Sequence, residues 1–201
     1  MRSILLAVLL ACCGTALAAP VILVFGDSLS AAYGLPQDAG WVALLGERLK
    51  QRQANYTVVN ASISGETSAG GARQIGGALK RYQPAIVILE LGANDGLRGL
   101  PVARMKANLA AIIRAAKRSH ARVLLVGMLL PPNYGAQYSG AFRRAFEELA
   151  REQRVPLVPF LLEGMADERD MYQADNLHPV AAAQPQLLEN VWRGLAPMLV
   201  K

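Results

Sequence analysis

Cysteine and histidine are both scarce in this chain of 201 residues. The only two cysteines, Cys12 and Cys13, are adjacent near the beginning of the sequence. Because the rest of the chain has no cysteine, it has no disulfide, no cysteine nucleophile and no cysteine-ligated metal. Histidine occurs only at His120 and His178, and so few ligands do not make a typical zinc site without cysteine. We expect no metal and no cofactor.

The apolar run at residues 4–10 is too short to cross a bilayer. It follows a positively charged start and precedes Ala16-Leu17-Ala18, which has the form of a small-x-small cleavage site. These features predict a signal peptide at residues 1–18 and a single mature domain at residues 19–201, in a periplasmic or secreted protein. Lipidation of Cys12 is the alternative, but it would make the signal very short.

Acidic residues are fewer than basic ones, and the formal net charge of +6 becomes +5 once Arg2 is removed with the signal. The basic residues fall mostly at helical spacing, so solvated helix surfaces explain them. Contact with an anionic lipid surface is a second interpretation. Nucleic acid is not expected as a partner, because no basic run is interleaved with aromatic residues. We expect a monomer.

The sequence shows no repeat, linker or shift in composition, and apolar runs alternate with amphipathic segments five times. This pattern predicts an α/β domain of three layers, α/β/α, around a five-stranded parallel sheet. A flavodoxin-like strand order is the expectation by analogy with other five-stranded sheets. The expected strands are residues 21–25, 56–60, 86–91, 123–128 and 156–162, and the clearest expected helices are residues 40–52, 101–119, 141–153 and 179–199.

The first expected strand ends at Gly26, and Asp27 and Ser28 occupy the turn that follows. Ligands of open α/β sheets bind at the carboxyl ends of the strands, so Ser28 lies where chemistry is usually done. Taken alone, this turn is better explained by helix capping, which favours the same residue types.

A serine nucleophile needs a base, and the two histidines differ in position. His120 precedes the fourth expected strand and belongs to the opposite edge of the sheet. His178 follows the fifth strand, and Asp175 lies three residues earlier, close enough to orient its imidazole. Ser28, His178 and Asp175 can meet only if the last loop folds over the end of the first strand.

Acyl transfer also requires hydrogen-bond donors for a developing oxyanion. The backbone N–H groups of Ser28 and Gly65 and the side-chain amide of Asn94 are the candidates at the same edge. For Gly65 or Asn94 alone, an ordinary turn residue is the better explanation.

Taken together, these loops resemble the SGNH, or GDSL, hydrolase family. The motifs that carry the resemblance are Gly26-Asp27-Ser28-Leu29-Ser30, Gly65, Gly92-Ala93-Asn94-Asp95 and Asp175-Asn176-Leu177-His178-Pro179, in that order. Longer runs such as Asn94-Asp95-Gly96-Leu97-Arg98-Gly99 look like the bacterial periplasmic branch of thioesterase I, protease I and lysophospholipase type. The resemblance implies Ser28 as nucleophile, Asp175 and His178 as its triad partners, and Ser28, Gly65 and Asn94 as the oxyanion hole.

The resemblance implies a secreted serine esterase that cleaves carboxylic esters and thioesters. Apolar residues on the surrounding loops, among them Leu97, Leu130, Tyr134 and Met171, predict a groove for a medium or long acyl chain of a small-molecule substrate. A carbohydrate O-acetyl esterase of the same fold is the first alternative, and it would need a small, polar site. The second is a flavodoxin-like binding module without catalysis, which offers no reason for Asp175 and His178.

Overall fold

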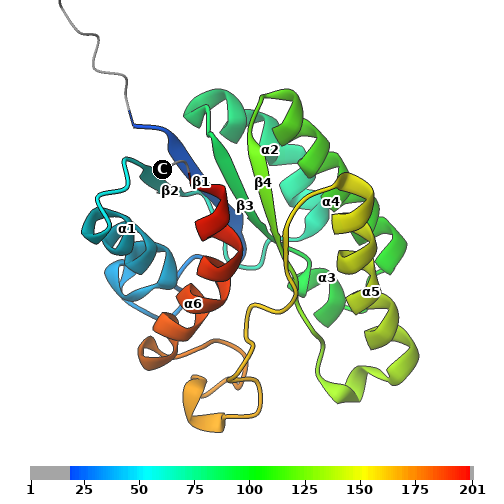
Figure 1. Ribbon diagram of the computed structural model, residues 1–201. Helices are drawn as coiled ribbons and strands as arrows, with labels where there is room; N and C mark the ends of the chain where they lie inside the picture. Colours follow the sequence, from blue (N-terminus) through cyan, green and yellow to red (C-terminus); the bar gives the residue numbers. More distant parts are fainter. Residues whose placement is uncertain (1–18, 200–201) are drawn as a thin grey trace, which may run out of the picture.

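The computed structural model describes residues 19–199. The predicted signal peptide and the cysteines lie outside the described residues. A parallel sheet forms the middle of the molecule, and helices cover both of its faces (Figure 1). No helix among residues 19–199 is long and apolar enough to span a membrane.

The sheet has the strand order β2-β1-β3-β4-β5, with all strands parallel, and this confirms the flavodoxin-like expectation. Leu23 of the central strand β1 faces Val59 of β2 on one side and Val87 of β3 on the other. Apolar, largely β-branched runs suit such strands, because both faces of a parallel sheet are covered. The strands are β1 Val21–Gly26, β2 Thr57–Asn60, β3 Ile86–Glu90, β4 Arg122–Val126 and β5 Leu157–Val158.

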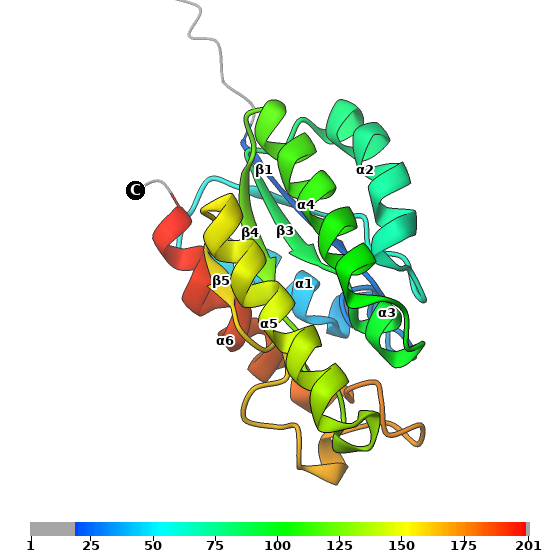
Figure 2. The same cartoon turned by 90° about the vertical axis from the view of Figure 1, so that its right-hand side faces the viewer.

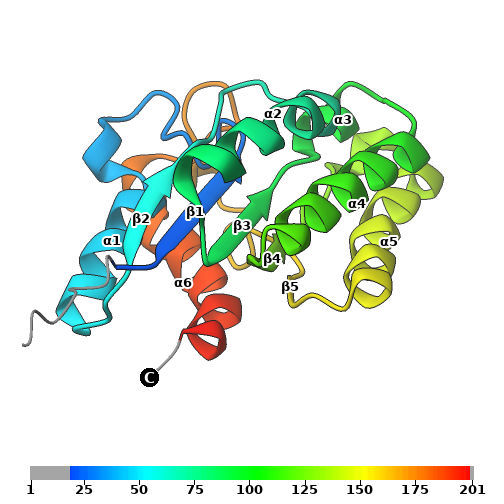
Figure 3. The ribbon, with the colours of Figure 1, turned by 90° about the horizontal axis from the view of Figure 1, so that it is seen from above.

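The helices form one layer on each face of the sheet (Figures 2 and 3). Leu23 and Phe25 of β1 point into the first layer, whereas Ile22 and Val24 point into the second, as the alternation of side chains along a strand requires. The first layer contains α2 Ser68–Tyr82, α4 Val102–Arg118 and α5 Ala136–Gln153, and the second contains α1 Trp41–Gln51 and α6 Gln184–Leu195.

The structure departs from the sequence expectations near prolines and glycines. β5 has only two residues, because Pro156 and Pro159 bracket it and proline cannot donate to the ladder. Residues 93–97 form a short helix, α3 Ala93–Leu97, rather than an open turn. The expected helix at 179–199 is divided into a 3-10 turn, α6 and a second 3-10 turn. The 3-10 helices are η1 Gln37–Ala39, η2 Pro132–Tyr134, η3 Arg169–Met171, η4 Ala181–Ala183 and η5 Ala196–Met198.

Candidate active site

Ser28 lies in the turn directly after β1, at the carboxyl edge of the sheet. The Asp27 side chain fixes the turn by accepting the N–H of Leu29 at 3.1 Å, while the Asp27 carbonyl accepts the N–H of Ala31 at 2.9 Å. Gly26 is required just before the turn, since a Cβ there would lie 2.6 Å from Glu90 Oε2 and 2.9 Å from the Glu90 carbonyl oxygen. Close packing of β1 on β3 therefore sets where the serine emerges.

His178 and Asp175 reach Ser28 from a loop about 150 residues further along the chain. The Nε2 atom of His178 lies 2.9 Å from Ser28 Oγ, and its Nδ1 atom lies 2.7 Å from Asp175 Oδ2. The other carboxylate oxygen of Asp175 accepts the N–H groups of Leu177 at 2.9 Å and His178 at 3.0 Å. Hydrogen bonds, first of all from the His178 backbone, hold the pKa of Asp175 down at about 2, so the carboxylate is ionised around neutral pH.

Tyr33 and Gln173, two residues that the sequence reasoning missed, help to position His178 and its loop. The ring of Tyr33 lies against the imidazole of His178, with ring centroids 4.3 Å apart. The side-chain amide of Gln173 donates to the carbonyl of Tyr33 at 2.9 Å and to that of Pro179 at 3.2 Å. The backbone N–H of Gln173 donates to the His178 carbonyl at 2.7 Å. The only available sequence signal was an aromatic residue in the same turn as Ser28.

Three potential donors line the cavity beside Ser28. The backbone N–H groups of Ser28 and Gly65 donate no hydrogen bond to any residue of the range 19–199. Gly65 has φ +78°, a conformation that favours glycine. The amide of Asn94 donates to Asp27 Oδ2 at 3.1 Å and to the Glu66 carbonyl at 3.0 Å, so an oxyanion would compete with one of these acceptors.

Three buried carboxyl groups, those of Asp27, Glu90 and Asp95, lie close to the loops of the site. Asp95 accepts the Ser68 N–H at 2.8 Å and the Ser68 hydroxyl at 2.6 Å, which ties α3 to the start of α2. Glu90, which the sequence reasoning did not single out, accepts the Ser30 hydroxyl at 2.7 Å and the Asp27 N–H at 3.3 Å.

Burial shifts the pKa values of the two carboxyl groups nearest the serine turn, Asp27 and Glu90. Burial raises the pKa of Asp27 to about 6, against the lowering effect of hydrogen bonds from Leu29 and Asn94. Burial, followed by the neighbouring Asp27 carboxylate, raises the pKa of Glu90 well above its usual value. By these contacts Asp27, Asp95 and Glu90 hold the loops around the site in place.

A cavity of about 910 Å³ opens beside Ser28 and His178, and its walls are largely apolar. Leu97 and Leu130 lie in these walls as expected, but Tyr134 and Met171 do not. Tyr134 instead donates its hydroxyl to the Leu97 carbonyl at 3.0 Å, and Met171 packs against the core on the α1 and α6 side. Other apolar lining residues are Leu29, Tyr33, Met128, Leu129, Pro131, Pro132, Phe160, Leu162, Tyr172 and Leu177.

His120 lies at the opposite edge of the sheet, beside Lys117 and Arg122, as the sequence argument requires. Across the described part of the chain, no three His, Cys, Asp or Glu side chains gather in a way that could hold a metal ion. The cavity beside Ser28 therefore presents a hydroxyl, an imidazole and a carboxylate in a hydrogen-bonded row, with N–H donors nearby. Such a row can transfer a proton from the hydroxyl as the oxygen attacks an electrophilic carbon.

Residues 24–184 match the GDSL-like lipase/acylhydrolase family over most of the chain. The chain belongs to this family. It is 52% identical over 182 residues to Esterase TesA of Pseudomonas aeruginosa, covering 90% of each chain. It is 40% identical over 184 residues to "Thioesterase 1/protease 1/lysophospholipase L1" of Escherichia coli K12, covering 92% of this chain and 87% of that protein.

A solved esterase structure has the same fold. The psychrotrophic esterase EstA from Pseudoalteromonas sp., in a structure inhibited by monoethylphosphonate, superposes with a TM-score of 0.85. Its sequence is 40% identical, and the match covers 89% of this chain and 97% of that one. The chain is thus an ester hydrolase with the SGNH fold, and the alternative of a non-catalytic binding module is set aside.

Proposed function

We propose that this GDSL hydrolase is a secreted serine esterase that cleaves carboxylic esters and thioesters with medium or long acyl chains. The observation that carries the proposal is the row from Ser28 Oγ to His178 Nε2 and from His178 Nδ1 to Asp175, at 2.9 and 2.7 Å, at the mouth of an apolar cavity. The names of the relatives, which include esterase and thioesterase, support the same class of substrate.

In the first half of the proposed reaction, Ser28 Oγ attacks the carbonyl carbon while its proton passes to His178 Nε2. The ionised Asp175 carboxylate holds the Nδ1–H and stabilises the imidazolium that forms. Negative charge develops on the carbonyl oxygen, and the N–H groups of Ser28 and Gly65 are free to donate to it. The Asn94 amide becomes a third donor when the oxyanion replaces one of its two present acceptors.

The tetrahedral intermediate then collapses, the bond to the alcohol or thiol breaks, and His178 returns its proton to the leaving group. The acyl group remains on Ser28 until water, deprotonated by His178, attacks the same carbonyl carbon. This second half releases the carboxylic acid and restores the Ser28 hydroxyl.

Apolar walls favour a long acyl chain over acetate. Leu97 and Leu130 line the cavity next to a broad group of leucine, proline and aromatic side chains. Each methylene that leaves water contributes up to about 0.8 kcal/mol, so a few carbons separate two esters by more than tenfold in kcat/KM. The carbohydrate O-acetyl esterase alternative would require a small polar cavity, which this lining does not favour.

The site of action is proposed from residues 1–18, whose charge, apolar run and cleavage sequence are those of a signal peptide. The protein would act as a monomer in the periplasm or outside the cell. N-terminal sequencing of the exported protein tests the proposed removal of residues 1–18 directly, and a start at Ala19 is expected.

The substrate proposal is tested by kcat/KM over p-nitrophenyl esters from acetate to palmitate, with lysophosphatidylcholine and acetylated xylan alongside. We expect a maximum at medium or long chains and measurable lysophospholipid hydrolysis. Two variants form a matched pair. Leu130→Ala in the cavity wall should lower kcat/KM selectively for the long-chain esters, whereas Leu100→Ala outside the wall should not. A profile that peaks at acetate or acetylated xylan would instead support the carbohydrate esterase.

A further inference from the structure

The edge of the sheet opposite Ser28 is strongly basic. At this edge, called here the amino edge, the strands begin, and the helices α1, α2, α4 and α5 end. Each of these helices carries Lys or Arg in its last turn, at the amino edge. None has an acidic residue in its first turn, towards the edge that carries Ser28. Apart from Lys50, the exposed Lys and Arg residues of the amino edge are Arg52, Lys80, Arg81, Lys117, Arg118, Arg122, Arg151 and Arg154.

None of these eight residues forms an ion pair with a carboxylate within the part of the chain that the structure describes. The ion pairs there use other basic residues: Arg48, Lys50, Lys106, Arg143, His178 and Arg193. Glu47 and Glu152, which lie towards the ends of α1 and α5, form ion pairs with Lys50 and Lys106. Arg52 and Arg151 lie near enough to Glu189 and Glu148 to help lower the pKa of those carboxyl groups, but the positive charge of the edge is only partly offset within the fold.

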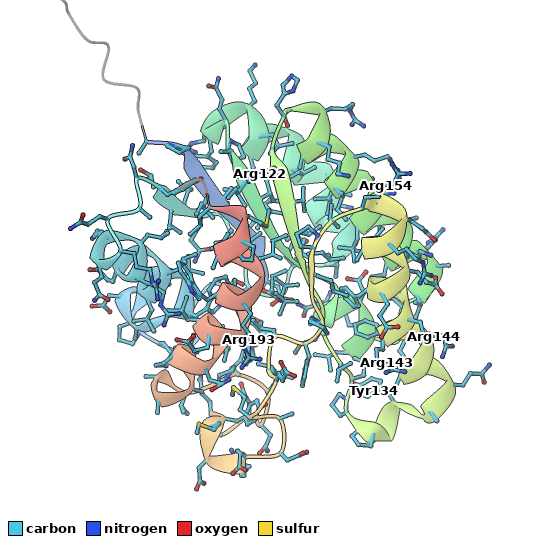
Figure 4. All side chains as sticks on the ribbon, in the orientation of Figure 1. Arg122, Tyr134, Arg143, Arg144, Arg154 and Arg193 are labelled. Carbon is cyan, nitrogen blue, oxygen red and sulfur yellow. The ribbon has the colours of Figure 1, made fainter. Side chains whose placement is uncertain are left out.

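Basic residues at helix ends are stabilised by the helix dipole, which accounts for several positions one by one. This explanation does not extend to Arg122, which begins the strand β4. The parallel α/β arrangement also brings all these helix ends to one face, so the result is a single positive surface. Figure 4 shows Arg122 and Arg154 at one end of the molecule and Arg143 and Arg144 towards the other.

A shallow groove of about 390 Å³ lies within this basic edge. Lys117, His120, Arg122 and Arg154 contribute to its rim, and the remaining lining residues are Ala121, Val123, Val155, Pro156 and Met198. Basic groups around an apolar floor fit a partner that has both anionic and apolar groups. Phospholipid has this chemistry, with phosphate at the surface of the bilayer and acyl chains beneath it.

The point where the chain enters the fold is a second, independent observation. β1 begins at Val21, and the carbonyl of Pro20 accepts the N–H of Thr57 at the start of β2, so both belong to the amino edge. The eighteen residues that precede Ala19 therefore join the fold at this edge, and they contain the apolar run 4–10. Before the proposed cleavage after Ala18, while that segment is held in a membrane, the amino edge is the part of the domain nearest to the lipid.

We propose that the amino edge docks on an anionic phospholipid bilayer, with the cavity beside Ser28 facing away from the lipid into the aqueous phase. Docking of this kind does not depend on which ester is the substrate. It keeps the hydrolase at the membrane surface while its cavity stays open to soluble or released lipids.

The test compares two triple variants that remove the same charge. R118Q/R122Q/R154Q changes the amino edge, and R104Q/R143Q/R144Q changes exposed residues of α4 and α5 nearer the other end. Each purified protein is sedimented with vesicles of equal parts phosphatidylglycerol and phosphatidylcholine, and with vesicles of phosphatidylcholine alone. Hydrolysis of a short soluble ester, expected to be unchanged in both variants, reports correct folding.

We expect the unaltered protein to bind only the anionic vesicles, in a way that weakens with added salt. The amino-edge variant should bind roughly 100-fold more weakly, at about fivefold for each cation lost, while the control variant stays close to the unaltered protein. Equal losses in the two variants would attribute binding to net charge and overturn the proposal. Absence of vesicle binding, or binding to duplex DNA in preference to vesicles, would overturn it as well.

Discussion

At the scale of single residues, the two buried carboxyl groups beneath Ser28 have a measurable effect on stability. Burial raises the pKa of Asp27 to about 6 and that of Glu90 well above its usual value. Between the unfolded and folded pKa values the native state binds more protons than the unfolded chain, so stability falls as pH rises. For Asp27 this window runs from about pH 4 to pH 6, and for Glu90 it begins near pH 4.5 and continues upward.

We therefore predict that Glu90→Gln reduces the fall in Tm between pH 5 and pH 8. Glutamine keeps an oxygen that can accept from the Ser30 hydroxyl but has no proton to lose. Thermal unfolding followed by circular dichroism should show a decline smaller by at least about 2 °C, which corresponds to a fraction of a kcal/mol or more for a domain of this size. The exposed Glu168→Gln is the control and should keep the original decline. If Tm falls as much in Glu90→Gln as in the unaltered protein, ionisation of the buried Glu90 does not destabilise the folded state.

Asn94 allows a second prediction at this scale. As an oxyanion donor it interacts mainly with charge that appears in the transition state, so Asn94→Ala should lower kcat by about 10²- to 10³-fold and leave KM nearly unchanged. Its bonds to Asp27 and the Glu66 carbonyl predict an additional loss of stability of about 1 kcal/mol.

The control for Asn94 is Asn190→Ala, since Asn190 also donates to two acceptors, the carbonyls of Leu161 and Glu163. It should lose stability but keep its kcat. If Asn94→Ala behaves in the same way, with normal turnover of the folded protein, Asn94 is only a turn residue.

At the scale of elements, the loop from Tyr172 to Pro179 depends on a few contacts to hold His178. An isolated antiparallel bridge joins Tyr172 to Pro179, and Gln173 connects the loop to the Tyr33 turn. Asp175 is 42% exposed, so core packing contributes little to its position. Besides the Tyr33 ring and the bond from His178 to Ser28, the hydrogen bond from the Gln173 amide to the Tyr33 carbonyl links the histidine loop to the serine turn.

We predict that Gln173→Ala lowers kcat by about 10- to 100-fold with little change in KM, because an ångström of displacement between reacting groups is enough for such a loss. Stopped-flow acylation with a chromogenic ester measures the step at Ser28 directly. Gln186→Ala, which removes an amide that donates to Asn190 and to the Glu163 carbonyl, should leave the acylation rate unchanged. Normal acylation in Gln173→Ala would show that the loop holds His178 without this side chain.

The elements also show how far sequence reasoning reaches. Four of the five strands were predictable within about two residues: β1, β3 and β4 from buried runs of β-branched and aliphatic residues, and the partly exposed β2 from its short β-branched run. β5 was not, since its length depends on where flanking prolines interrupt the ladder. Ser28, His178 and Asp175 could be singled out from strand ends and the scarcity of histidine. Glu90, Tyr33 and Gln173 could not, because their importance comes from contacts between segments far apart in the chain.

At the scale of the whole molecule, the two edges of the sheet have different chemistry. The carboxyl edge gathers the serine, the histidine, three buried carboxyl groups and the apolar cavity. The amino edge gathers exposed cations and the point where the chain enters β1 at Val21. Parallel strands produce this separation, because every strand ends at one edge and every crossover helix returns to the other.

The central claim is that Ser28 is the nucleophile and His178 its base, and covalent labelling tests it most directly. After treatment with an organophosphonate ester, peptide mapping should find one adduct, on Ser28. His178→Ala should slow its formation by about 10⁴-fold or more, while His120→Ala should label at the normal rate. An adduct on Ser30 or Ser64, or equal labelling rates in the two histidine variants, would contradict the account.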